Sequence, residues 1–178
     1  MKTLTRSLLV SALLLGAQPL LAESPTLWRI GVAVGLGGTE DAESSPGYDG
    51  SALQLTFAMD GDSGTSLVAR VGSIDFGDKD IDSLTEPEMR WVTIGGEYDF
   101  RGRWFDSGLF LALGGYQLEG TLGGISTDET AWGLSFGSTA EWRLNQRFSI
   151  DAELAGHWAD FEQAQIFLVG TVGMSVHF

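Results

Sequence analysis

Residues 166–178 read Ile-Phe-Leu-Val-Gly-Thr-Val-Gly-Met-Ser-Val-His-Phe, and their alternation decides what kind of fold the chain forms. Apolar residues recur at every second position, and those between them are largely small or polar, which is typical of a β-strand with one apolar face. A tilted strand of about 9–11 residues is long enough to cross a bilayer. The stretch therefore predicts a membrane-crossing strand that ends at a bilayer boundary. Its apolar face contains Ile166, Leu168, Val172, Met174, Val176 and the terminal Phe178.

The N-terminal segment has the layout of a secretory signal peptide. Lys2 and Arg6 precede a short apolar run, and the small residue Ala22 closes the segment. The run is well short of the ~20 apolar residues that a transmembrane helix needs. We therefore expect residues 1–22 to be removed as a signal peptide and residues 23–178 to form the mature domain. The chain contains no cysteine, so neither a lipid anchor on cysteine nor a disulfide is expected.

Seven further segments alternate in the same way, and clusters of Gly, Asp, Asn or Pro separate them. In each segment we assign the apolar face to lipid and the polar or small face to the interior. Arg70 supports this choice in its own segment, because an arginine that faces hydrocarbon is costly. One segment is apolar on both faces, and there we expect Leu109, Leu111 and Leu113 to face lipid. The seven segments are 28–37, 52–60, 65–73, 90–100, 108–118, 130–143 and 147–158.

The connections between the segments alternate in length. Three are short, at 60–64, 101–107 and 144–146, and longer or more acidic connections lie between them. Outer-membrane barrels have short periplasmic turns and long extracellular loops, whereas a soluble sandwich has no reason to sort its connections in this way. The chain is therefore predicted to be all-β, an eight-stranded antiparallel up-and-down transmembrane β-barrel in the cell outer membrane. The longer connections are 39–50, 74–88, 119–129 and 159–164.

The six tryptophans fit this topology. Membrane barrels carry aromatic girdles at both bilayer interfaces, whereas ordinary core aromatics would not sort by strand end. We expect Trp28, Trp104 and Trp142 at the periplasmic rim, and Trp91, Trp132 and Trp158 at the outer rim.

Residues 141–153 read Glu-Trp-Arg-Leu-Asn-Gln-Arg-Phe-Ser-Ile-Asp-Ala-Glu, and this stretch resembles the penultimate hairpin of small outer-membrane barrels. The whole mature chain is similar to the eight-stranded family that includes the OmpA transmembrane domain and OmpX. The resemblance implies a fold and an assembly route rather than an activity. It implies that Phe178 is an assembly signal, through which the C-terminal strand engages the barrel-assembly machinery. No cell-wall-binding domain is expected after Phe178.

Several charged residues fall on the inward faces of the predicted strands. Eight strands enclose a space just wide enough for side chains to fill, so a wide pore is not expected. Buried charges persist when they are paired and hydrogen-bonded, and we therefore expect a polar plug of ion pairs. A narrow ion or small-solute channel stays an alternative. The predicted lumen charge network consists of Arg70, Glu97, Glu141, Asp151, Glu153 and His157, with Arg29, Arg143, Arg147 and His177 near its periplasmic end.

The chain is acidic, with 24 acidic and 10 basic residues, which argues against nucleic acid as a partner. Most of the acidic residues fall in the longer connections, where only Lys79 opposes them. Oxygen ligands suit Ca²⁺ and Mg²⁺, but the alternate aspartates of 78–82 lack the glycine and the distal glutamate of an EF-hand loop, so no specific metal site is expected. The acidic residues of the connections are Glu40, Asp41, Glu43, Asp49, Asp75, Asp78, Asp80, Asp82, Glu86, Glu88, Glu119, Asp128, Glu129, Asp160 and Glu162.

Some small barrels are enzymes that modify the acyl chains of lipid A. Here Ser135, His157 and Glu153 nominally supply a nucleophile, a base and an orienting acid. All three are predicted to face the lumen, so we expect no catalytic site. The sequence predicts a non-enzymatic protein with a structural or surface-interaction role, in contact with outer-membrane lipid and lipopolysaccharide. We expect no cofactor, and a closed barrel without free edges is expected to be a monomer. Lipid A modification stays the alternative from another class.

Overall fold

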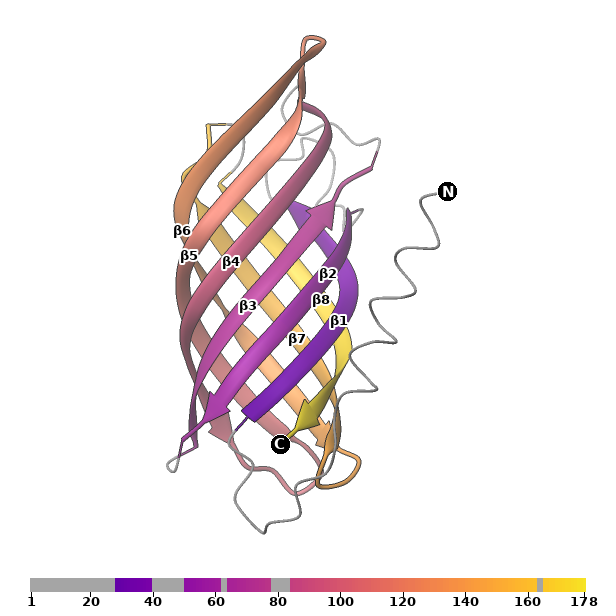
Figure 1. Ribbon diagram of the computed structural model, residues 1–178, viewed down its shortest axis with the longest axis vertical. Helices are drawn as coiled ribbons and strands as arrows, with labels where there is room; N and C mark the ends of the chain where they lie inside the picture. The colour runs from indigo at the N-terminus through magenta and orange to yellow at the C-terminus, as the bar shows by residue number, and fades with distance from the viewer. Residues whose placement is uncertain (1–27, 40–49, 62–63, 78–83, 163–164) are drawn as a thin grey trace.

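The computed structural model describes residues 28–39, 50–61, 64–77, 84–162 and 165–178, and these form a closed antiparallel barrel (Figure 1). Each strand pairs with its neighbour in the chain, and β1 closes the barrel against β8. The predicted eight-stranded fold is confirmed. The predicted signal peptide, residues 1–22, lies outside the described residues. The strands are β1 (Trp28–Thr39), β2 (Gly50–Asp60), β3 (Thr65–Asp75), β4 (Leu84–Phe100), β5 (Asp106–Leu122), β6 (Ile125–Arg143), β7 (Phe148–Ala159) and β8 (Ile166–His177).

The two ends of the barrel differ. At one end the chain enters at Trp28 and finishes at Phe178, and these two residues exchange backbone hydrogen bonds of 2.9 and 3.4 Å. We call this the terminal end. At the other end the hairpin of β5 and β6 rises beyond the rest of the barrel, and we call it the hairpin end (Figure 1). The described residues contain no helix long and apolar enough to cross a bilayer.

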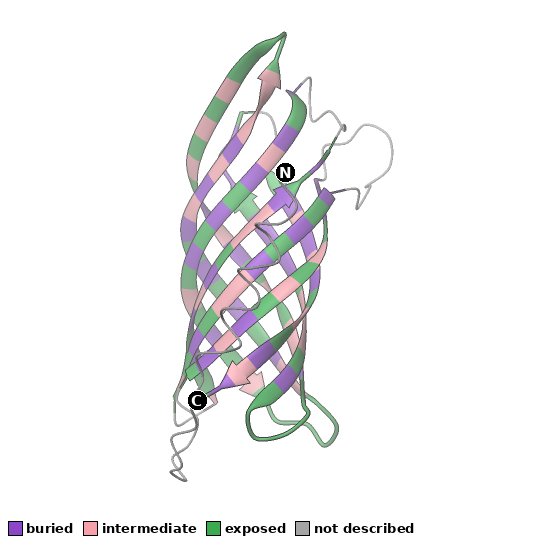
Figure 2. Ribbon diagram, turned by 45° about the vertical axis from the view of Figure 1, so that its right-hand side comes forward, coloured by how far each residue is buried: buried purple, intermediate pink, exposed green. Residues whose placement is uncertain are grey.

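Buried and exposed residues alternate along the strands (Figure 2), and many of the exposed outward side chains are large and apolar, whereas the inward side chains are mixed. In β5, whose sequence is apolar on both faces, Leu109, Leu111 and Leu113 point outward while Phe110 and Tyr116 are buried inside. The predicted orientation of these side chains is confirmed. Every backbone group of a closed ladder finds a partner within the sheet, which is what the hydrocarbon core of a membrane requires. Outward Leu, Val and Phe side chains can then contact acyl chains.

The prediction of a long connection at 119–129 is wrong. β5 continues to Leu122 and β6 begins at Ile125, so only Gly123 and Gly124 form the turn. Both glycines have positive φ, of 58° and 85°. Two-residue hairpin turns of this handedness need positive φ at both central positions, which glycine adopts without steric cost. The acidic residues of this connection therefore stand on paired strands rather than on a loop.

β4 also begins earlier than predicted, at Leu84. Its pairing with β5 shifts between Thr85 and Glu88, and Glu86 has a positive φ of 52°. This is a β-bulge, which is common where a strand leaves the rim of a barrel. Part of the connection predicted at 74–88 is thus strand, and the barrel wall is taller here than the sequence pattern indicates.

Candidate functional site

The lower part of the lumen contains an ion-pair network centred on Arg70. Its Nη2 donates to Glu97 at 2.7 Å and its Nε donates to Glu153 at 2.8 Å, and the side chain is 2% exposed. The guanidinium also lies 3.9 Å from the centre of the Phe110 ring. Strands β3, β4 and β7 are thereby joined across the lumen. A buried arginine with two carboxylates and an aromatic ring has the partners that a charge in low dielectric requires.

A second arginine, Arg29, extends the network toward the terminal end. Its Nη1 donates to Glu141 at 2.9 Å, and its Nη2 lies 3.6 Å from Glu97. Glu97 therefore faces both arginines, and it also accepts a hydrogen bond of 2.8 Å from the Thr139 hydroxyl. Gln54 donates to Glu153 at 3.1 Å. Together these contacts place paired charges across the middle of the barrel and leave a cavity of only about 40 Å³ between them.

Asp151 lies in the lumen, where it binds serine hydroxyls. It accepts hydrogen bonds from Ser149 at 3.1 Å and from Ser175. His177 contacts Ser149 at 3.0 Å and lies 3.4 Å from Glu141. These residues form a layer of polar side chains toward the terminal end.

His157 does not belong to the charge network, and its predicted place there is corrected. Its Nδ1 contacts the Tyr116 hydroxyl at 3.2 Å, and its ring centre lies 4.8 Å from that of Trp91. It lies four residues beyond Glu153 on β7, nearer the hairpin end, where the neighbouring side chains are aromatic. Two arginines also differ from the prediction: Arg147 is exposed, and Arg143 lies half-exposed at the rim, where it pairs with Glu141 at 2.8 Å.

The lumen at the hairpin end is apolar. Phe167 is fully buried, with its ring centre 6.3 Å from that of Phe76 and 6.0 Å from that of Phe161. Several of the cluster residues fall in predicted connections, so the cluster is not predicted from the sequence. A signal was present in the inward positions of the last strand, where Phe167 and Val169 precede Thr171. The main members of this apolar cluster are Ile74, Phe76, Leu84, Met89, Leu118, Phe161, Phe167 and Val169.

The candidate catalytic residues do not form a triad. Ser135 and His157 are direct cross-strand partners, but the His157 Nδ1 faces Tyr116 rather than a carboxylate. Both Glu153 oxygens bind other side chains, those of Gln54 and Arg70. Ser135 and His157 are also buried inside the barrel, away from the lipid face. An acyl chain in the surrounding membrane would therefore not reach them directly.

Five of the six tryptophans are exposed on the outside of the barrel, but Trp91 is not. The Trp91 side chain is 1% exposed and lies in the lumen, so its predicted place in an interfacial girdle is corrected. The reason is its parity: Trp91 is an inward position of β4, where it packs against His157. The register places Trp28 and Trp142 toward the terminal end and Trp132 and Trp158 toward the hairpin end. Trp104 lies in the connection between β4 and β5.

Acidic residues form one row across the outer face at the hairpin end. Successive strand pairings align Asp75 with Glu88, Glu88 with Glu119, and Glu119 with Asp128. Arg90 lies beneath this row and binds Glu88 at 2.9 and 3.1 Å and Glu119 at 3.2 Å. The expectation that only Lys79 opposes the acidic residues is therefore corrected. No cluster suited to a metal ion occurs among the described residues, and the aspartates of 78–82 lie outside them.

The known family described as outer membrane protein beta-barrel domain matches residues 7–176. The chain belongs to this family. It is an outer-membrane protein, and the predicted resemblance and localisation are confirmed. The long hairpin is accordingly assigned to the cell exterior and the terminal end to the periplasm, as outer-membrane barrels are built. No curated relative matches the chain in sequence.

Several solved structures share the fold. Neisserial surface protein A (NspA) has a TM-score of 0.71 at 12% identity, covering 88% of this chain and all of that one. Ail, the attachment invasion locus protein of Yersinia pestis, has a TM-score of 0.63 at 12% identity, covering 85% and 97%. The N-terminal barrel domain of Pseudomonas aeruginosa OprF has a TM-score of 0.62 at 11% identity, covering 87% and 100%. Identities this low establish the fold alone.

Proposed function

We propose that the protein is a non-enzymatic outer-membrane scaffold that does not conduct solutes and that makes surface contacts through its acidic extracellular residues. The observation that carries the proposal is the filled lumen. Phe167 and its neighbours close the extracellular half with apolar side chains, and Arg70 with Glu97 and Glu153 fills the half below. A solute would have to displace a packed core and then separate buried ion pairs, both of which are costly.

The hairpin of β5 and β6 supports the surface-contact part of the proposal. Glu119 and Asp128 lie on it as a cross-strand pair, and Glu129 follows. β7 pairs with β6 only from Gly133 onward, so the β6 arm of the hairpin extends past β7, whereas β4 pairs with the β5 arm as far as Leu122. Its tip is apolar, with Ile125 74% exposed. Ail, one of the similar barrels, is named for attachment, which is compatible with contacts made from this end.

The assembly route and the partners are part of the same proposal. The C-terminal strand would engage the barrel-assembly machinery, with Phe178 as its last residue, and barrel closure against Trp28 would complete insertion. Outer-membrane lipid and lipopolysaccharide would surround the apolar outer face. The ladder is closed where all eight strands pair and has no free edge there, which favours a monomer; the exception is the segment 125–132 of β6, which lies above its pairing with β7.

Recording across planar bilayers tests the closed lumen. The unmodified protein should give no conductance above the baseline, whereas the double variant Phe161→Ala and Phe167→Ala should raise leak by removing two rings from the apolar cluster. Steady conductance of the unmodified protein would contradict the closed lumen.

Binding of fluorescent oligolysine to cells that display the protein tests the acidic surface. Replacing Glu119 and Glu129 by Gln and Asp128 by Asn should lower binding, because exposed opposite charges attract weakly but additively. Asp106→Asn, at the periplasmic end, is the matched control and should leave binding unchanged. Equal binding by the triple variant and the unmodified protein would contradict the proposal that the hairpin makes the surface contacts.

Lipid A mass spectra from cells with and without the protein test the enzymatic alternative. The scaffold proposal expects identical acyl patterns. An acyl change that His157→Ala abolishes would replace the scaffold with an enzyme.

A further inference from the structure

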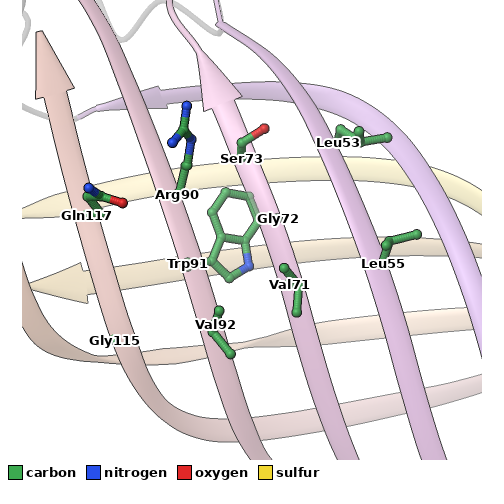
Figure 3. Close-up of a pocket in the computed structure, with 10 residues that line it drawn as sticks. All are labelled: Leu53, Leu55, Val71, Gly72, Ser73, Arg90, Trp91, Val92, Gly115 and Gln117. Carbon is green, nitrogen blue, oxygen red and sulfur yellow. The ribbon is translucent and has the colours of Figure 1, made fainter. Parts of the chain in front are cut away.

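A groove of about 490 Å³ lies on the lipid-facing side of β2 to β5, toward the extracellular end (Figure 3). Eight of its ten lining residues come from two outward cross-strand rows, which the strand register defines, and the other two, Gly72 and Trp91, belong to the inward row between them. Figure 3 shows the polar side chains Ser73, Arg90 and Gln117 at one end, and Val71 and Val92 at the other. The upper row is Leu53, Ser73, Arg90 and Gln117, and the lower row is Leu55, Val71, Val92 and Gly115.

Gly115 leaves the groove open on the β5 side. It aligns with Val92 on one side and with Trp132 on the other. A Cβ at this position would meet no atom within 4 Å, so the outer surface is hollowed here by the width of a side chain. Trp132, the cross-strand partner of Gly115 on β6, is 81% exposed and is not part of the groove's lining. Acyl chains are flexible enough to enter such a notch, and burying apolar surface there is favourable.

The groove changes from apolar to polar from its deeper end toward the membrane surface. An outer-leaflet lipid has the same order, with its acyl chains deeper and its head group at the surface. The apolar row lies deeper in the membrane and the row of Arg90 and Gln117 lies nearer the surface. Immediately above it runs the acidic row that includes Glu119 and Asp128. Gln117 donates to Asp128 at 3.0 Å and Arg90 to Glu119 at 3.2 Å, so both carboxylates are held just above the groove, next to its upper row but not in its lining.

The charge at the top of the groove is negative overall. Arg90 is the one cation among the described residues of these two rows, and four carboxylates align above it. An anionic head group would meet net repulsion there, whereas an ammonium group would meet opposite charge. The charge therefore distinguishes between lipids that the apolar part of the groove would accept equally.

We propose that the groove binds an acyl chain of an outer-leaflet lipid whose head group carries an ammonium group. The acyl chain lies along Val71, Val92 and Gly115, and the ammonium group lies at Glu119 and Asp128. The binding is independent of any soluble partner and of the lumen. It gives the barrel a preferred lipid neighbour on one side.

Native mass spectrometry of the full chain, released from vesicles, tests this site. The vesicles hold equal amounts of phosphatidylethanolamine and phosphatidylglycerol with identical acyl chains. We expect retained lipid to favour phosphatidylethanolamine by about fivefold, the effect of a partly exposed charge pair. Glu119→Gln with Asp128→Asn should bring the ratio near one and keep a lipid bound.

Filling the groove provides the matched comparison. Gly115→Leu should abolish the retained lipid, while Gly96→Leu should not. Gly96 is also an outward glycine with open space around it, but it lies outside the groove. Both variants should show heat-modifiable gel migration, which reports folding. Retention of lipid by Gly115→Leu, a preference for phosphatidylglycerol, or absence of retained lipid from the unmodified protein would each overturn the proposal.

Discussion

The two halves of the lumen are packed with different kinds of side chains, charged in one half and apolar in the other. In the periplasmic half, Arg70 and Arg29 are paired with Glu97, Glu141 and Glu153 across the barrel. In the extracellular half, apolar rings and aliphatic chains meet in a closed cluster. The wall is one continuous ladder around both. The comparison shows that an eight-stranded wall fixes the space to be filled and leaves the filling chemistry to the inward residues.

The difference predicts unequal responses to substitution. A buried ion pair contributes little when its partners are replaced together, but removing one partner leaves a buried charge without compensation. When a buried apolar side chain is truncated, the loss of stability grows with the volume of the cavity that remains. Neutral hydrogen bonds contribute less than either.

The largest effect is expected in the polar half. Arg70→Leu should destabilise the barrel by about 3–5 kcal/mol, because Glu97 and Glu153 lose their closest cation. Urea titration of the protein in lipid vesicles, followed by tryptophan fluorescence, measures the change. Adding Glu97→Gln and Glu153→Gln to Arg70→Leu should recover most of the loss. A triple variant as unstable as the single variant would show that packing, not charge, holds this layer.

The apolar half should respond nearly as strongly, but without rescue by charge. Phe167→Ala removes a fully buried ring and should cost about 3 kcal/mol or somewhat more. Phe167→Leu keeps much of the volume and should cost less than half as much in the same titration. If both variants unfolded at the same urea concentration, the cluster would not be a packed core.

The sequence predicted the wall of the barrel well and its filling only in part. Alternation gives the face of each residue directly, because side chains of a strand point to opposite sides with period two. Arg70, Glu97 and Glu153 were therefore placed inside correctly. The same rule gives no depth and no partner, so His157 was grouped with charges that lie lower in the lumen. Trp91 was assigned to the membrane interface from its distance along the strand, although its parity pointed inward.

The extracellular region is harder to predict from the sequence, because a strand made of polar residues has a composition similar to that of a loop. Residues 119–129 are acidic and polar, yet they form paired strands around Gly123 and Gly124. Two glycines between short alternating runs are a hairpin signal, and this signal was available in the sequence. Apart from the inward Phe167 and Val169 of the last strand, the apolar cluster has no local signal, because Ile74, Leu84 and Phe161 fall in predicted connections and meet only in the closed barrel.

A smaller loss of stability is expected in the neutral layer between the two halves, where Tyr116 contacts His157. Tyr116→Phe removes the hydroxyl that contacts the His157 Nδ1 and should destabilise the barrel by about 1 kcal/mol, the usual net contribution of a neutral hydrogen bond. The double variant with His157→Leu should be less destabilised than the sum of the two single variants, because the residues share one contact. The same vesicle titration gives all three values. An effect of Tyr116→Phe as large as that of Arg70→Leu would mean that this layer carries charge, and the boundary between the polar and apolar halves would then lie nearer the extracellular rim.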